Sequence, residues 1–292
     1  LDADADALSG ARQLYAATAP LRRAPIGKIY TRVANLAHPR ALSQLPDDFS
    51  LIFVGNVLTE LPETARAPLL DMLLSRLAPD GVLLIIEPAL RHTTHALHHL
   101  RDTLIAKGRA RVFAPCSHQL PCPLTDTEAW CHEIRIWQHL PPRLRKLAAA
   151  TGRRRRDLKF SYLTLLPPNT NAHASASNPP PKNAEGDAYR VVGSIQRSKG
   201  RREVALCAAG QHLTALRLDR DQSEFNRVFA RVGRGQFLWF AATKDAGCSS
   251  GDREEKAPQA PSGGQDPSPR LRVTSDTQVI GLDPSDIDRP DG

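Results

Sequence analysis

LIFVGNVLTELPETARAPLLDMLLSRLAPDGVLLIIEP, residues 51–88, is the stretch that decides the fold class. It begins with the apolar run 51–55 and ends with the apolar run 82–86, each short and continuous as in a buried parallel strand. Between them, residues 62–77 are typical of a helix with Pro62 in its first turn, and Pro79-Asp80-Gly81 is typical of a turn. Strand, helix and strand at this spacing predict a parallel α/β sheet.

The rest of the chain divides into segments of different character. Helices are expected over 9–19 and 93–107, and a strand over 160–166. Several short β patterns then follow one another within about 50 residues, which favours a small barrel or meander. We therefore expect four parts, namely an α/β domain 1–166 with a Cys-rich loop 114–137, a Pro/Asn/Ser/Ala linker 167–188, a small β domain 189–243, and a disordered Gly/Pro/Ser/Asp-rich tail 244–292.

Composition and charge exclude several classes of protein. The 292 residues carry a formal charge of +8, and because residues 244–292 hold 6 basic and 10 acidic residues, the preceding part carries +12. This basic body favours a polyanionic partner. No apolar run approaches the roughly 18 residues that cross a bilayer, so we expect no membrane association. The acidic start LDADADALSG has no initiator Met, which predicts a fragment whose true start lies upstream.

The strongest chemical signal is the block APCSHQLPCPLTDTEAWCHE at 114–133, which places three cysteines in one polar, Pro-rich loop: Cys116, Cys122 and Cys131. Thiolates are soft ligands for zinc or iron–sulfur clusters. A fourth ligand must come from elsewhere, and Cys207 is the first candidate, with His118 and His132 competing. The alternative is a set of buried or free cysteines. The absence of the C-x2-C pairs of common zinc sites favours a cluster.

Several motifs occur in the order of a known family: GNVLTELP at 55–62, GVLLIIEP at 81–88, R-x2-L-I at 101–105, APCSHQLPCPL at 114–124, WCHE at 130–133, DLKFSYLTL at 157–165 and VALCAAG at 204–210. They resemble the Rsm22-like family, which includes the mitochondrial methyltransferase-like protein seventeen and bacterial relatives. The resemblance implies a Rossmann-like S-adenosylmethionine methyltransferase domain, incomplete at its N-terminus, with a small C-terminal β domain. It implies a [4Fe–4S] cluster on Cys116, Cys122, Cys131 and Cys207, and a role in assembly of the small ribosomal subunit.

The same resemblance suggests where S-adenosylmethionine would bind. The Gly-rich turn that such folds place after their first strand is missing from this sequence. Asp2, or else Asp4, would then stand where an acidic residue receives the ribose hydroxyls, although an acidic helix cap is an equal reading. Asn56 and Glu87 follow two neighbouring strands, at the edge where ligands bind in this fold. We find no convincing catalytic base or nucleophile.

A run of basic residues marks a candidate RNA surface, with nine basic and two acidic residues between 132 and 160. The RNA-binding candidates are Arg143, Arg145, Lys146, Arg153, Arg154, Arg155, Arg156 and Lys159. Such residues neutralise phosphates, although a solvated face is the usual alternative. Arg190, Arg197, Lys199, Arg201 and Arg202 extend the surface onto the β domain, which resembles an OB-type barrel. His92, His95 and His99 are more typical of a solvent-facing or cleft-lining set than of a zinc site.

We therefore expect an iron–sulfur-binding, methyltransferase-like factor that binds rRNA and supports small-subunit assembly. One alternative is an active S-adenosylmethionine-dependent RNA methyltransferase, and the other is a zinc-stabilised interaction module. The cluster would be structural or would let iron supply gate assembly. The protein is expected to be monomeric off the ribosome, in the bacterial cytoplasm or in the mitochondrial matrix.

Overall fold

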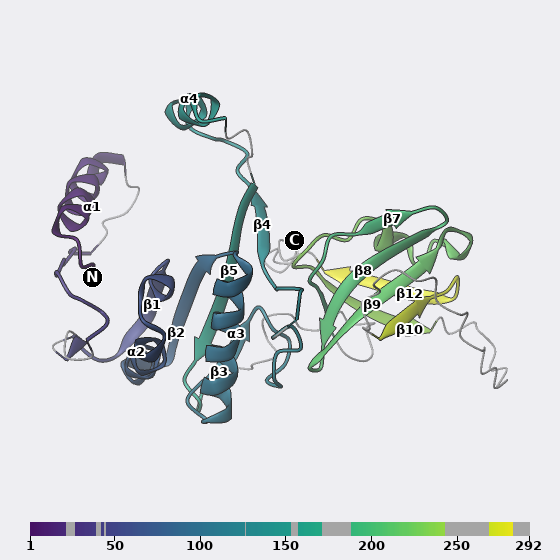
Figure 1. The fold of residues 1–292 in the computed structure, drawn as a ribbon, viewed down its shortest axis with the longest axis horizontal. Coiled ribbons are helices and arrows are strands. Elements are labelled where there is room, and N and C mark those ends of the chain that lie inside the picture. The colour runs from purple at the N-terminus through teal and green to yellow at the C-terminus, as the bar shows by residue number, and fades with distance from the viewer. Residues whose placement is uncertain are drawn as a thin grey trace.

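The computed structural model of the chain describes residues 1–21, 27–38, 42–43, 45–125, 127–152, 157–170, 188–242 and 269–282. It contains two sheets that lie side by side, one covered by helices and one forming a separate β domain (Figure 1). The α/β part comprises α1 (Ala5–Ala17), η1 (Ala19–Leu21), β1 (Phe49–Gly55), η3 (Leu58–Glu60), α2 (Glu63–Ser75), β2 (Leu77–Pro88), α3 (Arg91–Ala106), β3 (Arg111–Ala114), β4 (Glu133–Ile136), α4 (Pro142–Ala150) and β5 (Asp157–Leu166).

The first sheet has the strand order β1-β2-β5-β3, with β4 paired to β5. β1 and β2 are parallel, as the sequence predicts, but β5 runs antiparallel to β2, β3 and β4. The predicted parallel arrangement therefore holds for β1 and β2 but does not extend to β5. After β3 the chain stays at the carboxyl edge of the sheet, where Pro88 pairs with Phe160, so β5 enters from that edge and runs backwards. The result is a mixed α/β domain.

The turn predicted at Pro79-Asp80-Gly81 is instead an irregularity inside β2. Phe49 pairs with Leu77 whereas Leu51 pairs with Val82, so β2 contains extra residues opposite β1. A Cβ at Gly81 would lie 2.4 Å from the carbonyl oxygen of Phe49, and only glycine allows this close approach. The apolar residues on both sides continue the pairing through a sequence that locally favours a turn.

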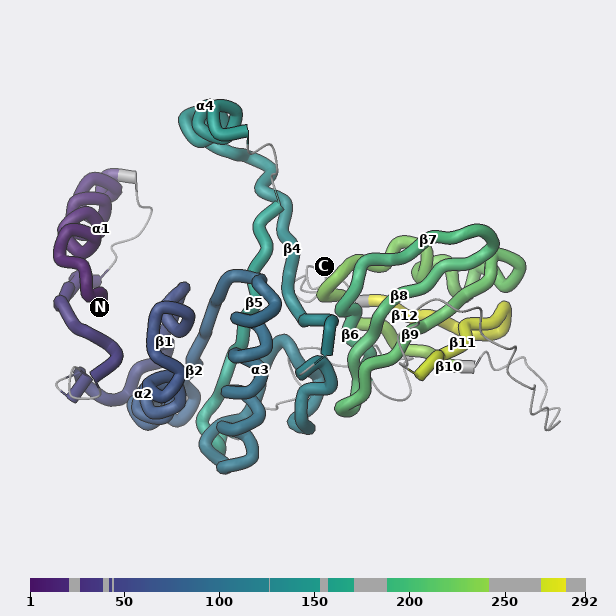
Figure 2. Tube along the Cα trace, in the orientation of Figure 1, coloured from purple at the N-terminus to yellow at the C-terminus, as the bar shows by residue number. Residues whose placement is uncertain are grey.

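The core of the α/β part lies between the sheet and helices α2 and α3, which pack against each other and against β2 (Figure 2). α3 buries Thr94, Leu97, His98, Arg101 and Leu104, a spacing that places them on one face of the helix. The opposite face of the sheet is less covered, because two apolar side chains of the edge strand β1, at positions 51 and 53, are about 60% exposed.

The β domain contains β6 (Tyr189–Val191), β7 (Gln196–Ser198), β8 (Arg201–Ala208), β9 (Gln211–Leu218), η4 (Asp219–Asp221), η5 (Arg227–Ala230), β10 (Phe237–Ala242), β11 (Arg270–Val273) and β12 (Thr277–Leu282). Its order is β11-β9-β8-β6-β10-β12, with β7 paired to β8. The expectation of a disordered tail is wrong for 270–282, because Val273 and Val279 are buried in the core of this sheet. These two strands were missed because their short apolar patterns lie within a segment whose overall composition is rich in Gly and Pro. Residues 244–268 and 283–292 lie outside the described residues.

Two helices stand away from the rest of the molecule. α1 at the N-terminus and α4 at the tip of the β4–β5 ribbon bury none of their residues (Figure 1). Of the predicted linker, the structure describes residues 167–170 and 188. Thr170 donates a hydrogen bond to the carbonyl oxygen of Pro79 at 3.0 Å. Among the described helices, none is both long and apolar enough to span a membrane.

Candidate metal centre between the two sheets

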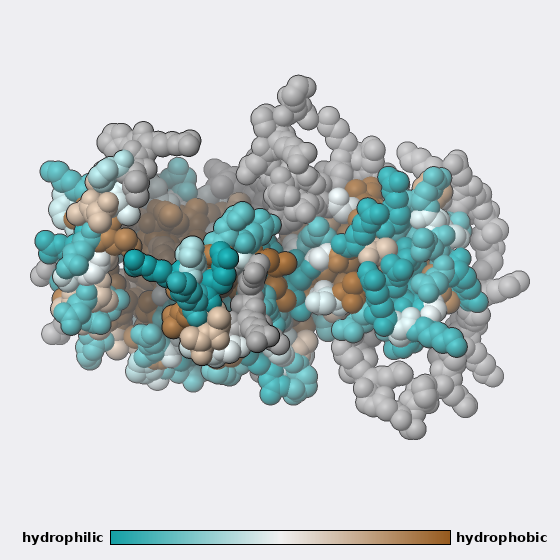
Figure 3. Space-filling model, turned by 90° about the horizontal axis from the view of Figure 1, so that it is seen from above, coloured by the Kyte–Doolittle hydropathy of each residue, from teal (hydrophilic) through white to brown (hydrophobic). Residues whose placement is uncertain are grey.

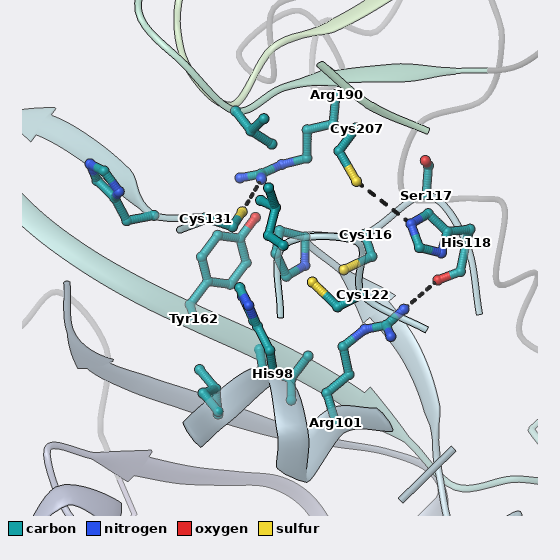
Figure 4. A pocket seen from close by; sticks show the side chains of 16 residues that line it. His98, Arg101, Cys116, Ser117, His118, Cys122, Cys131, Tyr162, Arg190 and Cys207 are labelled. Carbon is teal, nitrogen blue, oxygen red and sulfur yellow. Dashed lines mark hydrogen bonds between the residues drawn. The ribbon is translucent and has the colours of Figure 1, made fainter. Parts of the chain in front are cut away.

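The four cysteines that the sequence singles out line one pocket at the junction of the two sheets: Cys116, Cys122, Cys131 and Cys207. Cys116 follows β3, Cys122 lies in the next loop, Cys131 precedes β4 and Cys207 comes from β8 of the β domain. Figure 4 shows the sulfur atoms of Cys116 and Cys122 turned toward each other, with Cys131 and Cys207 nearby. None of the four forms a disulfide. The fold therefore brings together cysteines separated by up to 91 residues in the chain.

The alternation of β8 explains why Cys207 faces this pocket. Val204, Leu206 and Ala208 point into the core of the β domain, so Cys207 points to the opposite face, toward the α/β part. Its Sγ lies 3.7 Å from Nε2 of His118. His132 also lines the pocket and stacks on Trp130, with ring centroids 5.6 Å apart. Both histidines that the sequence offers as alternatives to Cys207 thus line the same pocket, and His118 is in contact with Cys207.

Arg190 links the β domain to the cysteine loop. This residue of β6 is 3% exposed, and its Nη1 donates to Cys131 Sγ at 2.7 Å. Its Nη2 forms an ion pair with Glu133, which is also buried. The guanidinium group reaches across the junction and provides positive charge beside a thiol. Its expected place on an RNA surface is therefore wrong, because its contacts with Glu133 and with the Cys131 sulfur hold it in the interior.

Arg101 holds the cysteine loop from the other side. This residue of α3 is 1% exposed and donates to the carbonyl oxygens of His118 at 2.8 Å and Leu120 at 2.9 Å. Its neighbour Asp102 accepts a hydrogen bond from the backbone N–H of Cys122 at 2.9 Å. Arg101 belongs to the R-x2-L-I motif, but its role depends on contacts that the sequence does not reveal. Two buried guanidinium groups thus flank the four sulfurs.

Burial controls the ionisation of the thiols. It raises the pKa of Cys122 to about 11, and it also raises the pKa of Cys116 and of Cys207. Without a metal these side chains are neutral at pH 7, and a metal must displace their protons when it binds. Among the described residues, no three Cys, His, Asp or Glu side chains lie close enough to hold a single ion.

The comparison with known families identifies one family that matches most of the chain. A family model described as mitochondrial small ribosomal subunit Rsm22 matches residues 12–232, which is more than half of the chain. The chain belongs to the Rsm22 family. No curated protein matches the sequence. The matched region of this Rsm22-family chain contains all four cysteines and both buried arginines.

His98 is a pocket residue that sequence reasoning missed. It lies on α3 and is 9% exposed, and its Nδ1 has no hydrogen-bond partner in the described structure. Burial, together with the charges of nearby His95 and Arg101, lowers the pKa of His98 to about 3, so it is neutral at pH 7. The sequence signal was present only as its spacing on the buried face of α3. His92 and His99 are exposed, as expected for the solvent-facing alternative.

The residues expected at an S-adenosylmethionine site have structural roles in the Rsm22-family fold. Asp4 caps α1 by accepting from the backbone N–H groups of Asp6 and Ala7, as the cap alternative predicts. Glu87 is 1% exposed, and its Oε1 accepts from two backbone N–H groups of the segment after β1, at 3.0 and 2.8 Å. Asn56 is exposed at the end of β1, with a φ of 55°. S-adenosylmethionine binding stays a prediction.

Asp2 lies within the N-terminal segment. It pairs with Val33 in an isolated bridge, and its carboxylate accepts from the backbone N–H of Asp4 at 2.9 Å. Within the described residues, no hydrogen bond joins it to Asn56 or Glu87. Asn56 and Glu87 do lie at one strand edge, because Asn56 and Glu87 follow the paired residues Gly55 and Ile86.

The basic residues of the expected RNA surface fall on the projecting arm of the Rsm22-family fold. Arg143, Arg145 and Lys146 are exposed on α4, and Lys159 is exposed on β5 beside Asp157. Arg153, Arg154, Arg155 and Arg156 lie outside the described residues. On the β domain, Arg197, Lys199 and Arg201 are exposed, and Arg202 is half-buried with its Nε 3.8 Å from Asp219.

Proposed function

We propose that this Rsm22-family protein binds a [4Fe–4S] cluster through Cys116, Cys122, Cys131 and Cys207 and acts in assembly of the small ribosomal subunit. The observation that carries the proposal is the convergence of these four thiols from two domains on one pocket. Core packing alone does not favour four cysteines and two buried arginines at one junction, because buried charges need partners.

The surroundings of the pocket support a cluster rather than a zinc ion. The cysteine loop lacks the close pairs of common zinc sites. Arg190 already donates an N–H to one sulfur, and hydrogen bonds to sulfur help to set the properties of iron–sulfur clusters. Arg190 and Arg101 also offset part of the negative charge that four thiolates bring into a buried site. When bound, the cluster would crosslink the β domain to the α/β part.

The family supports the choice of partner and compartment. The description of the family model names the mitochondrial small ribosomal subunit, which favours the mitochondrial matrix over the bacterial cytoplasm. The exposed basic residues of α4 and of the β domain favour contact with rRNA, because phosphates attract such side chains regardless of sequence. We expect the protein to be monomeric when it is not on the subunit.

The test is the iron, acid-labile sulfide and zinc content of the protein purified without oxygen, together with its visible spectrum. We expect about four iron and four sulfide per chain, with a broad brown absorption. Replacing any one of the four cysteines by serine should lower the iron content. Cys248→Ser is the matched control, because that cysteine does not belong to the set, and it should keep full iron.

Two results would contradict the proposal. Stoichiometric zinc without sulfide would leave the four ligands in place but turn the site into a structural zinc centre. Protein with neither metal would mean that the cysteines only pack against each other. If iron remains unchanged in Cys207→Ser, the fourth ligand is a histidine of the same pocket, for which His118 is the first candidate.

A further inference from the structure

The first observation concerns the projecting arm. α4 buries none of its residues, and its basic side chains, Arg143, Arg145 and Lys146, form no ion pair with any described residue. α4 itself contains no acidic residue. An exposed nine-residue helix with an unpaired basic side adds little to the stability of the fold. Its charge is instead available to an outside polyanion.

A second basic element lies at the tip of the β7–β8 hairpin. The segment RSKGRR at 197–202 contains four basic residues and no acidic one, and Arg197, Lys199 and Arg201 are exposed. Arg197 lies directly opposite Arg202 in the strand register. Like charges placed opposite each other destabilise a hairpin. Within the described residues, Asp219 lies 3.8 Å from Arg202 and Glu203 lies 3.8 Å from Arg201, which offsets part of this repulsion. The exposed Arg197 and Lys199 form no ion pair with a described residue, so a polyanion beside them would stabilise the hairpin further.

Both basic elements are connected to the cysteine site by a strand. Cys131 comes just before β4, the strand that leads to α4, and Cys207 lies on β8, the strand that begins in the basic hairpin. Arg201 and Cys207 are six residues apart on one strand, roughly 20 Å at the rise of a β-strand. In the view of Figure 1, α4 and β7 lie on the same side of the molecule, and Figure 3, seen from that side, shows hydrophilic residues gathered over the β domain.

We propose that α4 and the β7–β8 hairpin form one two-part surface for RNA phosphates, and that the four-cysteine site sets the spacing between its two halves. The proposal rests on the proposed association with rRNA. Crosslinking at the common root of the two elements fixes their distance, so both halves engage one RNA without the entropic loss of a loose pair of domains. Loss of the metal then weakens RNA binding without removing a single phosphate contact.

The experiment measures binding of the full chain to a small-subunit rRNA fragment at 50–200 mM salt. One variant neutralises the arm (R143Q/R145Q/K146Q) and another the hairpin (R197Q/K199Q/R201Q). A matched control neutralises three other exposed residues of the β domain (R227Q/R231Q/R270Q). If each half makes three phosphate contacts, the advantage of the wild-type protein over either variant shrinks about 20- to 40-fold between 50 and 200 mM salt, the smaller value holding for single-stranded RNA. The control variant should keep nearly the wild-type salt dependence.

The role of the cysteine site is tested with metal-depleted protein and, independently, with Cys207→Ser. In both, we expect weaker RNA binding and a smaller difference between wild-type and hairpin-variant affinities, because the β domain is no longer held in place. If wild-type protein binds RNA but both variants behave like the control, the two-part surface is wrong while the proposed function stands. If wild-type protein does not bind RNA at all, both fail. If metal depletion leaves the RNA affinity unchanged, the spacing role is refuted.

Discussion

The ion pair between Arg190 and Glu133 is the most direct test of the domain junction. Its side chains are 4% and 3% exposed, and they come from different sheets. Replacing Arg190 by Met removes the positive charge and leaves Glu133 buried beside the cysteines. Glu133 keeps one other cation, Arg135, at 3.1 Å, but the side chain of Arg135 is half exposed.

The expected loss follows from this geometry. Removing one partner of a buried ion pair costs about 3–5 kcal/mol of unfolding free energy. The remaining contact with Arg135 compensates part of that loss, so we expect about 3 kcal/mol for Arg190→Met. The pair of Arg109 and Asp71 is a matched control, because its atoms are 3.0 Å apart but its side chains are 50% and 35% exposed. Arg109→Met should cost less than about 1 kcal/mol.

Urea unfolding, followed by circular dichroism and by tryptophan fluorescence, measures both variants. In a double-mutant cycle with Glu133→Gln, the double variant should be more stable than the sum of the single effects predicts, by at least about 1 kcal/mol. The reasoning is refuted if Arg190→Met costs no more than Arg109→Met. It is equally refuted if the two junction substitutions add without coupling, because the side chains would then not be a buried pair.

Three further predictions concern single positions. Gly235→Ala should destabilise the protein more than Gly200→Ala. Both glycines have a positive φ, +88° and +77°, which costs about 1–2 kcal/mol for alanine, but only at position 235 would the new Cβ also lie 2.6 Å from the carboxylate oxygens of Glu133. Equal shifts in melting temperature for the two variants would contradict this. The pKa of His98, lowered by burial to about 3, makes protonation favour the unfolded chain, so stability falls as the pH drops below 6.5. We expect a loss of about 2 kcal/mol at pH 5, absent in His98→Gln, and parallel pH profiles would exclude His98 as the cause. Glu87→Leu should lower the free energy of unfolding by about 2–4 kcal/mol, because it leaves two backbone N–H groups without an acceptor. Glu87→Gln keeps an acceptor oxygen and should cost much less. If Glu87→Leu does not change the stability, Glu87 has no structural role and is again a candidate for cofactor binding.

The sequence by itself determined the local elements and the ligand types. Apolar runs gave β1 and β2, and the periodic burial of α3 follows from its pattern of Leu and Thr residues. The cysteine loop indicated a soft-metal site before any fold was known, because thiols in a polar, Pro-rich segment are hard to explain by packing. These properties depend on residues that are close together in the chain, and a sequence pattern records such local relationships directly.

The tertiary structure alone decided what lies beside the cysteines and which way the strands run. Arg190 looked like a surface residue, and only the pairing of β6 with β8 places its guanidinium group between Cys131 and Glu133. β5 is reversed because of where the chain re-enters the sheet, and β11 and β12 join the β domain across a sequence whose composition favours disorder. Such contacts join residues far apart in the chain, so their energies depend on the packed three-dimensional arrangement and leave no local signal.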